Sequence, residues 1–382
     1  MYFVLRRSRF IAPIVLLLAI TTSHAGFAAS LEDADAKSKA VEDKMRAAAS
    51  GEVTNPEQRK QIELDTRAAI ASARTAYAEI EASTTPDLDV IRSYVRFLQM
   101  TGDYDLAATQ LERAIVLAPD DMELYLSLGR TYFHWGPQYA KKAEDILKKA
   151  LTINANSPAA GQVYVLLGRV YVSMGLYDFA AENFTAGLEL DPANSVGHIG
   201  KACMLIRDGK MAEGDAILDK LNELPPQYAA VLEEMLAAAL QDFESAGKWF
   251  PDTAEDHLAY AKALLRASRL PASEGPLKRS LKLKSDNYVA YNMLGNVQRS
   301  LGKMADARAA FRSSLALNPD QPRTQEALQQ VLDYEAAQQQ AQPAPVPVPT
   351  PPAAVEPAPA PGPAEPSAVP APVVEPAAPA AQ

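Results

Sequence analysis

Residues 161–194 read GQVYVLLGRVYVSMGLYDFAAENFTAGLELDPAN, and the order of small and large residues in this stretch decides the fold. Gly168 lies in its first half, and Ala180 precedes Phe184 by four positions in its second half. Two helices that cross closely need a small residue where their backbones approach and a large residue beside it. The stretch therefore predicts a helix–turn–helix unit, with its turn at Gly175.

The same pattern returns along the chain at intervals close to 34 residues. The small residue of the first helix recurs at Val95, Gly129, Gly168, Ala202, Ala261 and Gly295, with spacings of 34, 39, 34, 59 and 34. The clearest copies are Tyr125-x₂-Leu128-Gly129, Tyr164-x₂-Leu167-Gly168 and Tyr291-x₂-Leu294-Gly295. Together they resemble the tetratricopeptide repeat, a helix–turn–helix unit of 34 residues. The resemblance implies an all-α fold, a right-handed α-solenoid in which each unit covers the apolar face of its neighbour.

The spacings also predict the organisation of the chain. Six repeats are expected at 88–121, 122–157, 161–194, 195–228, 254–287 and 288–321. The spacing of 59 exceeds the repeat by 25 residues, so we expect a helical insertion at 229–253. Residues 26–87 are predicted to form an N-terminal helical region with helices at 34–49 and 56–82, and 322–341 to form a capping helix.

Both ends of the chain differ in composition from this repeat region. Residues 1–25 combine a basic start, an apolar run at 11–20 and small residues before Ala25, which predicts a signal peptide cleaved after Ala25 or Ala28 and a bacterial periplasmic location. Of the 29 prolines, 15 lie in the last 40 residues, which contain no aromatic residue, lysine or arginine. Such a segment cannot bury enough apolar surface to fold, so 342–382 is predicted to be a disordered Pro/Ala-rich tail.

The composition argues against several classes of activity. A net charge of −10 disfavours nucleic-acid binding, and a single Cys excludes a disulfide framework. The sequence holds no H-E-x-x-H, G-x-S-x-G or G-x-G-x-x-G motif. His134, His198 and His257 fall in different repeats, so we expect no metal site, no cofactor and no catalytic residues. Cys203 is expected to be a packed small hydrophobe, with an exposed reactive thiol as the alternative.

The resemblance also implies a partner-binding surface, because the first helix of each tetratricopeptide unit usually lines a concave groove. The positions that would face this groove hold Arg92, Arg96, Arg130, Phe133, His134, Arg169, Arg207, Lys262, Arg266, Asn292, Asn296 and Arg299. Guanidinium groups suit carboxylates, so this basic ladder predicts an acidic partner segment or a free C-terminal carboxylate. The alternative is that Asp89, Glu123 and Glu255, on the same face, pair with these cations.

These observations favour a non-enzymatic periplasmic scaffold or co-chaperone that binds a partner protein or peptide in the groove, in the assembly of a cell-envelope machine. A structural tether that uses the Pro-rich tail as a spacer or ligand is the alternative. An enzyme whose site is spread over several repeats is the more remote one. No nucleic-acid partner and no stable membrane insertion after signal cleavage are expected.

Overall fold

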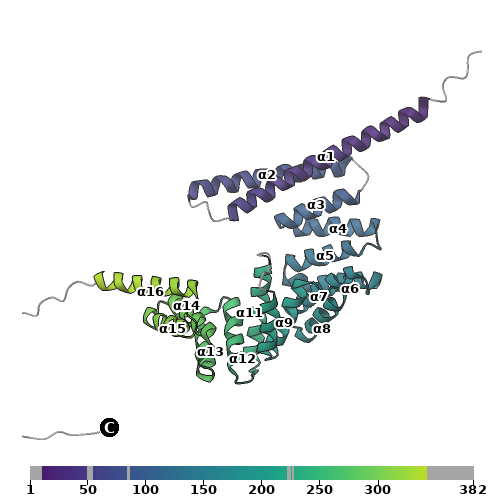
Figure 1. Cartoon of the computed structure of the whole chain (residues 1–382). Helices are drawn as coiled ribbons and strands as arrows, with labels where there is room; N and C mark the ends of the chain where they lie inside the picture. The colour runs from purple at the N-terminus through teal and green to yellow at the C-terminus, as the bar shows by residue number, and fades with distance from the viewer. Residues whose placement is uncertain (1–10, 50–54, 84–86, 222–224, 226–227, 342–382) are drawn as a thin grey trace, which may run out of the picture. The chain divides into compact units, whose positions relative to one another are not determined.

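The computed structural model describes residues 11–49, 55–83, 87–221, 225 and 228–341. Within these ranges the protein is all-helical, with sixteen α-helices, one short 3₁₀ turn and no strand (Figure 1). The predicted Pro/Ala-rich tail at 342–382 and the first ten residues of the predicted signal peptide lie outside the described residues. The chain divides into two units, Met1–Leu332 and Asp333–Gln382, and the described part of the second unit is the end of the last helix.

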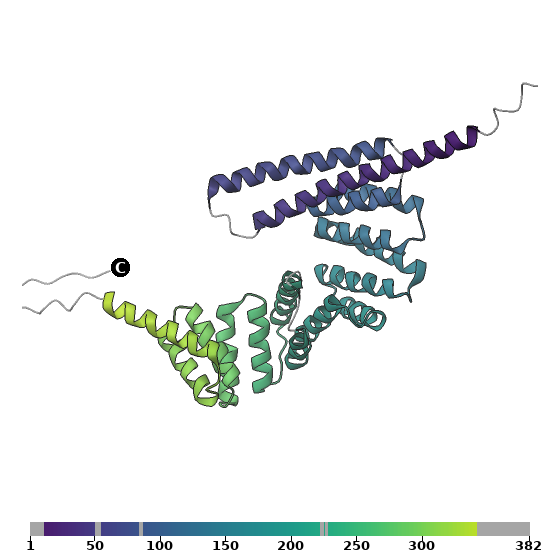
Figure 2. The same ribbon diagram turned by 45° about the horizontal axis from the view of Figure 1, so that its top comes forward.

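The helices of the first unit form a series of antiparallel pairs, so the fold is an α-solenoid, and neighbouring pairs pack against each other (Figures 1 and 2). In chain order the elements are α1 (Ile11–Ala49), α2 (Pro56–Ser83), α3 (Leu88–Thr101), α4 (Tyr104–Leu117), α5 (Met122–Trp135), η1 (Pro137–Tyr139), α6 (Ala140–Asn154), α7 (Pro158–Ser173), α8 (Tyr177–Leu190), α9 (Ser195–Arg207), α10 (Met211–Lys220), α11 (Ala229–Ser245), α12 (Ala254–Arg266), α13 (Leu270–Leu283), α14 (Tyr288–Ser300), α15 (Met304–Leu317) and α16 (Pro322–Ala341).

The first helix of every predicted repeat begins at a side-chain cap. In each case a side-chain oxygen accepts a hydrogen bond from a backbone N–H of the first turn, which would otherwise have no partner. The capping residues are Asp87, Asp121, Ser157, Asn194, Thr253 and Asn287. The cap at Ser157 starts α7 at Pro158, three residues before the predicted repeat 161–194. These side-chain caps therefore explain why the first helix of each repeat begins where it does.

Glycines follow the first helix of most pairs, as the sequence predicts. Gly102, Gly175, Gly209 and Gly302 have φ between 72° and 81°, the left-handed region that glycine enters at least cost. Gly136 differs, with φ 138° and ψ 169°. A proline follows it, and proline disfavours the helical region for the preceding residue. At Gly136 the chain therefore leaves α5 in an extended conformation with positive φ, and η1 provides the turn.

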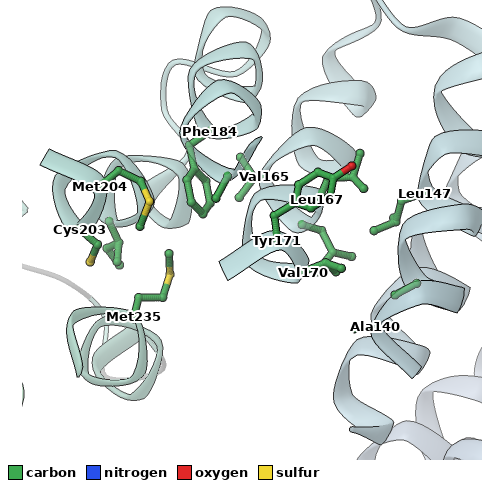
Figure 3. Close-up of a cluster of buried hydrophobic side chains, with 14 of the residues drawn as sticks. Ala140, Leu147, Val165, Leu167, Val170, Tyr171, Phe184, Cys203, Met204 and Met235 are labelled. Atoms are coloured by element: carbon green, nitrogen blue, oxygen red, sulfur yellow. The ribbon is translucent and has the colours of Figure 1, made fainter. Parts of the chain in front are cut away.

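Close packing of each pair depends on one glycine and one large side chain. A Cβ atom at Gly168 would lie 2.7 Å from Phe184, one at Gly129 2.5 Å from Leu147, and one at Gly295 2.6 Å from Phe311. Phe184 is fully buried, and its ring also lies against Gly200 of the next pair. Figure 3 shows this ring between the helices α7 and α9. The predicted close approach of the two helices is therefore confirmed at these three glycines, and the large side chains that contact them are Phe184, Leu147 and Phe311 of the second helices.

The insertion consists of one helix, α11, which packs against α9 and α12 (Figure 1). Its buried face comprises Met235, Leu236, Ala239, Leu240 and Phe243. Met235 lies beside Cys203 and Met204 of α9 (Figure 3). The helix α10 packs directly against α12, so the stacking of pairs continues past the insertion. The side of α9 that was expected to face an open groove is therefore covered by α11.

The first and last helices differ from the repeats between them. The helix α1, expected to begin at Ala34, begins at Ile11 and passes both predicted cleavage positions. It pairs with α2, and Tyr77 of α2 stacks on Tyr94 of α3 with ring centroids 5.0 Å apart. At the other end, Val331 of α16 packs in one cluster with Phe311. Within the described ranges, no helix combines the length and the apolar composition that crossing a membrane requires.

Candidate functional site

Four of the eight cations in the predicted basic ladder pair closely with carboxylates within the fold. Arg92 pairs with Asp89 at 3.4 Å and with Asp121 at 2.5 Å. Arg207 contacts three aspartates at 2.8–3.0 Å, namely Asp178, Asp208 and Asp242. These cations already have partners, so they are poorly suited to attract an acidic ligand. Of the acids that were expected to compete, Asp89 pairs with Arg92, whereas Glu255 lies 3.5 Å from Lys284.

The cations of α12 are also paired. Lys262 and Arg266 both reach Asp215 and Asp219 of α10 over distances of 2.5–2.8 Å. The side chain of Asp215 is only 11% exposed, so this cluster connects α10 and α12 beneath the surface. The two helices are neighbours although the insertion separates them in sequence. These ion pairs therefore stabilise the packing of α10 against α12, which continues the solenoid across the insertion.

The last predicted positions form a polar cavity of their own. Asn292 donates hydrogen bonds to Thr324 and Gln321, Asn296 donates to Asn292, and Arg299 donates to Gln330 of α16. A cavity of about 340 Å³ is lined by Asn292, Asn296, Arg299, Arg323, Glu326, Ala327 and Gln330. The amides are thus bonded to one another and to the capping helix.

Four arginines of the ladder have no close carboxylate among the described residues: Arg96, Arg130, Arg169 and Arg299. Among the described residues, Arg130 of α5 forms no ion pair, and Arg169 of α7 has only Glu234 of α11, with 3.8 Å between Nη2 and Oε2. Arg96 of α3 donates to Ser93 at 2.9 Å. The side chain of Arg169 is 14% exposed, whereas Arg130 is exposed. Arg96 and Arg299 are hydrogen-bonded to Ser93 and Gln330, whereas Arg130 and Arg169 have neither a close carboxylate nor such a partner among the described residues.

Arg130 and Arg169 line the same cavity. Its volume is about 480 Å³, and its wall comprises Arg130, Gln162, Val165, Leu166, Arg169, Asp191, Ala193, Asn194, Ser195, Val196 and Tyr228. The wall is mixed, because buried Val165 and Leu166 lie beside the guanidinium groups. The one carboxylate in the lining, Asp191, accepts a hydrogen bond from Asn194 at 3.0 Å. The cavity can therefore hold an anionic group and an apolar side chain together.

The surroundings of Arg169 favour an additional negative charge. Its guanidinium carbon lies 4.5 Å from the ring centre of Phe133, a cation–π contact that orients the group. Burial lowers the pKa of Arg169, Glu234 opposes this effect, and Arg130 adds to it. Burial, followed by the charges of Arg169 and Arg130, also lowers the pKa of His134, although this side chain is partly open to solvent. Burial is thus the main cause of both pKa shifts, and the neighbouring positive charges add to it.

The residues considered for chemistry do not converge. Cys203 is fully buried, and burial raises the pKa of its thiol, so the packed alternative is confirmed and the reactive one is wrong. His198 contacts the carbonyl oxygen of Pro192 at 2.9 Å, and His257 contacts Asp252 at 2.7 Å. In the part of the chain that the structure describes, no three potential metal ligands form a cluster.

Sequence reasoning missed the contribution of the insertion. Tyr228, just before α11, forms part of the cavity wall, and Glu234 of α11 is the ion-pair partner of Arg169. The break in the 34-residue period signalled that extra residues were present. It carried no information on which surface they would cover, because that depends on contacts between distant parts of the chain.

The stacked helix pairs define the chain as a helical-repeat protein, and comparisons with known proteins identify the repeat. Tetratricopeptide repeat profiles match residues 100–160, 161–194 and 258–322. The TPR repeat-containing protein YpiA of Bacillus subtilis is 23% identical over 157 residues, which cover 41% of this chain and 36% of YpiA. The match thus spans about a third of that relative's length.

Two solved structures are similar in fold. A tetratricopeptide repeat protein from Parabacteroides merdae is 13% identical, with a TM-score of 0.39, and the match covers 72% of this chain and 96% of that one. YrrB, described as a TPR protein with an unusual peptide-binding site, is 15% identical, with a TM-score of 0.33 and coverage of 56% and 95%. The chain therefore contains repeats of the tetratricopeptide family at residues 100–160, 161–194 and 258–322. Members of this family are in general scaffolds for protein–protein interaction rather than catalysts.

Proposed function

We propose that the protein is a non-enzymatic scaffold of the bacterial periplasm, where it holds an acidic segment or the C-terminal carboxylate of a partner protein during assembly of a cell-envelope machine. The binding site is the cavity that Arg130 and Arg169 line. The observation that carries the proposal is the lack of a close carboxylate at these two arginines within the described residues, whereas Arg92, Arg207, Lys262 and Arg266 are paired.

Electrostatics supports an acidic ligand at this position. A guanidinium that is largely withdrawn from water loses hydration, and a carboxylate that forms two parallel hydrogen bonds with it restores much of that loss. Phe133 restricts the orientation of Arg169 by stacking, so less conformational freedom is lost when a ligand binds. Val165, Leu166 and Tyr228 add apolar surface for a neighbouring side chain of the partner.

The first experiment identifies the partner and locates the contact. A photo-crosslinking amino acid placed at Gln162, an exposed residue of the cavity wall, should capture the partner in intact cells. The same amino acid at Arg312, an exposed position on α15, serves as the control. Mass spectrometry of the crosslinked species then identifies the partner. Equal crosslinking at both positions would contradict binding at the cavity.

The second experiment tests the charges. Arg169→Glu should weaken binding of the captured partner about tenfold or more, because loss of a buried charge-assisted contact costs about 2–5 kcal/mol. Arg130→Glu should weaken it less, because Arg130 is exposed. Arg312→Glu makes the same change of charge away from the cavity and should leave affinity unchanged. Affinity is measured by isothermal titration calorimetry. Full affinity in both cavity variants would refute the proposed site.

The location has its own test. Exported protein should be recovered from the periplasmic fraction with an N-terminus at Gly26 or Ala29, as the small residues before them predict. N-terminal sequencing of the purified protein measures this. Recovery of the uncleaved chain in the cytoplasmic fraction would refute the periplasmic part of the proposal and leave the cavity to be tested separately.

A further inference from the structure

Glu234 of α11 lies near Arg169 of the cavity wall, and their contact is neither a firm ion pair nor a chance approach of surface charges. Its Oε2 atom is 3.8 Å from Nη2 of Arg169, which is too long for a hydrogen bond. The side chain of Glu234 is 66% exposed, whereas that of Arg169 is 14% exposed. The carboxylate therefore approaches a mostly buried cation from the solvent side and is held only weakly.

The other neighbours of Arg169 make this weak contact important. Phe133 contributes a ring face, and Arg130 contributes a like charge that lowers the pKa of Arg169. Asp191, the other acidic residue at the cavity, is bonded to Asn194. Among the described residues, Glu234 is thus the one carboxylate paired with this guanidinium, and its charge opposes the effect of burial on the pKa of Arg169.

The backbone beneath Glu234 is fixed while its side chain is free to move. The next residues, Met235 and Leu236, are 2% and 0% exposed, so α11 is anchored in the core directly beside Glu234. Displacing the helix would expose this apolar face, which is costly. Rotating an exposed glutamate side chain costs little. Exchange at Arg169 therefore requires movement of one side chain and no rearrangement of α11.

We propose that Glu234 is an internal carboxylate that occupies Arg169 loosely in the free protein and is replaced by a carboxylate of the partner. The inference rests on the proposed function, because it assumes an acidic ligand at the same cavity. Glu234 then acts as a specificity-determining residue. A ligand without a negative charge cannot replace its interaction with Arg169, whereas an acidic ligand must compete with it.

The test uses Glu234→Gln, which keeps the size of the side chain and removes its charge. The matched control is Glu233→Gln, because Glu233 is an exposed neighbour on the same helix. The probe is a fluorescein-labelled octapeptide with four glutamates and a free C-terminus, measured by fluorescence anisotropy with full-length protein. Without the competing carboxylate, affinity should rise about threefold, the factor that a weak ion pair represents. Glu233→Gln should bind like the unaltered protein.

The outcomes separate this inference from the function on which it rests. Tighter binding by Glu234→Gln alone supports the exchange. Binding that is unchanged or weaker in Glu234→Gln overturns the exchange, and if Arg169→Glu still abolishes that binding, the acidic-ligand site remains valid. If the octapeptide binds neither the unaltered protein nor Glu234→Gln, both proposals are overturned.

A ligand-free measurement provides an independent check. Glu234→Gln should lower the midpoint of thermal unfolding by about 1–2 °C, because the buried guanidinium loses its partner. In a protein that already carries Arg169→Met, the same change should have no effect. Equal shifts in the two backgrounds would show that the residues are not coupled and would overturn the inference.

Discussion

The packing of Phe184 between two glycines leads to a quantitative prediction for Gly168→Ala. The added Cβ would lie 2.7 Å from Cε1 of Phe184, well inside contact distance. The ring cannot move toward α9, because it already lies against Gly200. A Cβ atom added at Gly200 would be only 2.5 Å from Cδ1 of Phe184. Overpacking of this kind costs about 1–3 kcal/mol. Alanine regains about 0.5–1 kcal/mol of helix propensity, so the net loss should be about 1–2 kcal/mol.

Gly275→Ala is the matched control. Gly275 also lies inside a helix, α13, but no atom lies within 4 Å of its added Cβ. Pro276 follows Gly275, and a Cβ before a proline disfavours helical backbone, so the gain in helix propensity is offset and stability should change by less than about 1 kcal/mol. A clearly larger loss in Gly168→Ala than in Gly275→Ala isolates the contribution of Phe184.

Urea unfolding followed by circular dichroism at 222 nm measures both variants. Stacked repeats do not always unfold in one step, so the comparison uses the midpoint and the shape of the transition. Phe184→Leu should relieve the clash, and combined with Gly168→Ala it should cost about 1 kcal/mol less than the sum of the single changes. A Gly168→Ala variant that is at least as stable as the unaltered protein would refute the packing argument.

Three further predictions concern buried polar groups. Burial alone would raise the pKa of Glu144, but hydrogen bonds from two lysines and a tyrosine lower it from 4.5 to about 2. This carboxylate should contribute about 1–2 kcal/mol of stability, because the lysines that bind it are mostly exposed. The contribution should be complete above pH 4.5 and should be lost as the pH falls toward 2. In acid titrations of unfolding, the stabilities of Glu144→Gln and the unaltered protein should therefore converge near pH 2. Cys203 should resist iodoacetamide in the native protein and react only after denaturation, and rapid native labelling would contradict its burial. Asp215→Asn should cost about 1–3 kcal/mol in urea and Asp219→Asn less, because their side chains are 11% and 42% exposed; equal effects would show that burial does not govern the cluster.

The helix pairs were predictable because their signals are local. Gly129 with Leu147 and Gly168 with Phe184 lie within one unit of the chain, and the structure places both as contacts. The end of α5 was harder to predict. A glycine at 136 indicated a turn, but its conformation is determined by Pro137 and by the 3₁₀ turn that follows.

The candidate site was predicted only in part. Arg130 and Arg169 were expected to face a groove, and they do line one cavity. Arg207 was expected to face the same groove, yet it pairs with Asp242, which lies 35 positions later in the sequence. Whether an arginine remains open to a ligand depends on carboxylates that folding brings from other helices, and repeat periodicity carries no record of those pairings.

The sequence by itself determined the repeating unit, because the capping side chains act within one turn of helix and the glycines contact large residues of the same helix pair. Only the tertiary structure decided where α11 lies. Its apolar face packs against α9, buries Cys203, and brings Glu234 to Arg169 from 65 positions away. The physical reason is that an apolar face is buried wherever a complementary surface is open, and that surface exists only once the neighbouring helices have stacked.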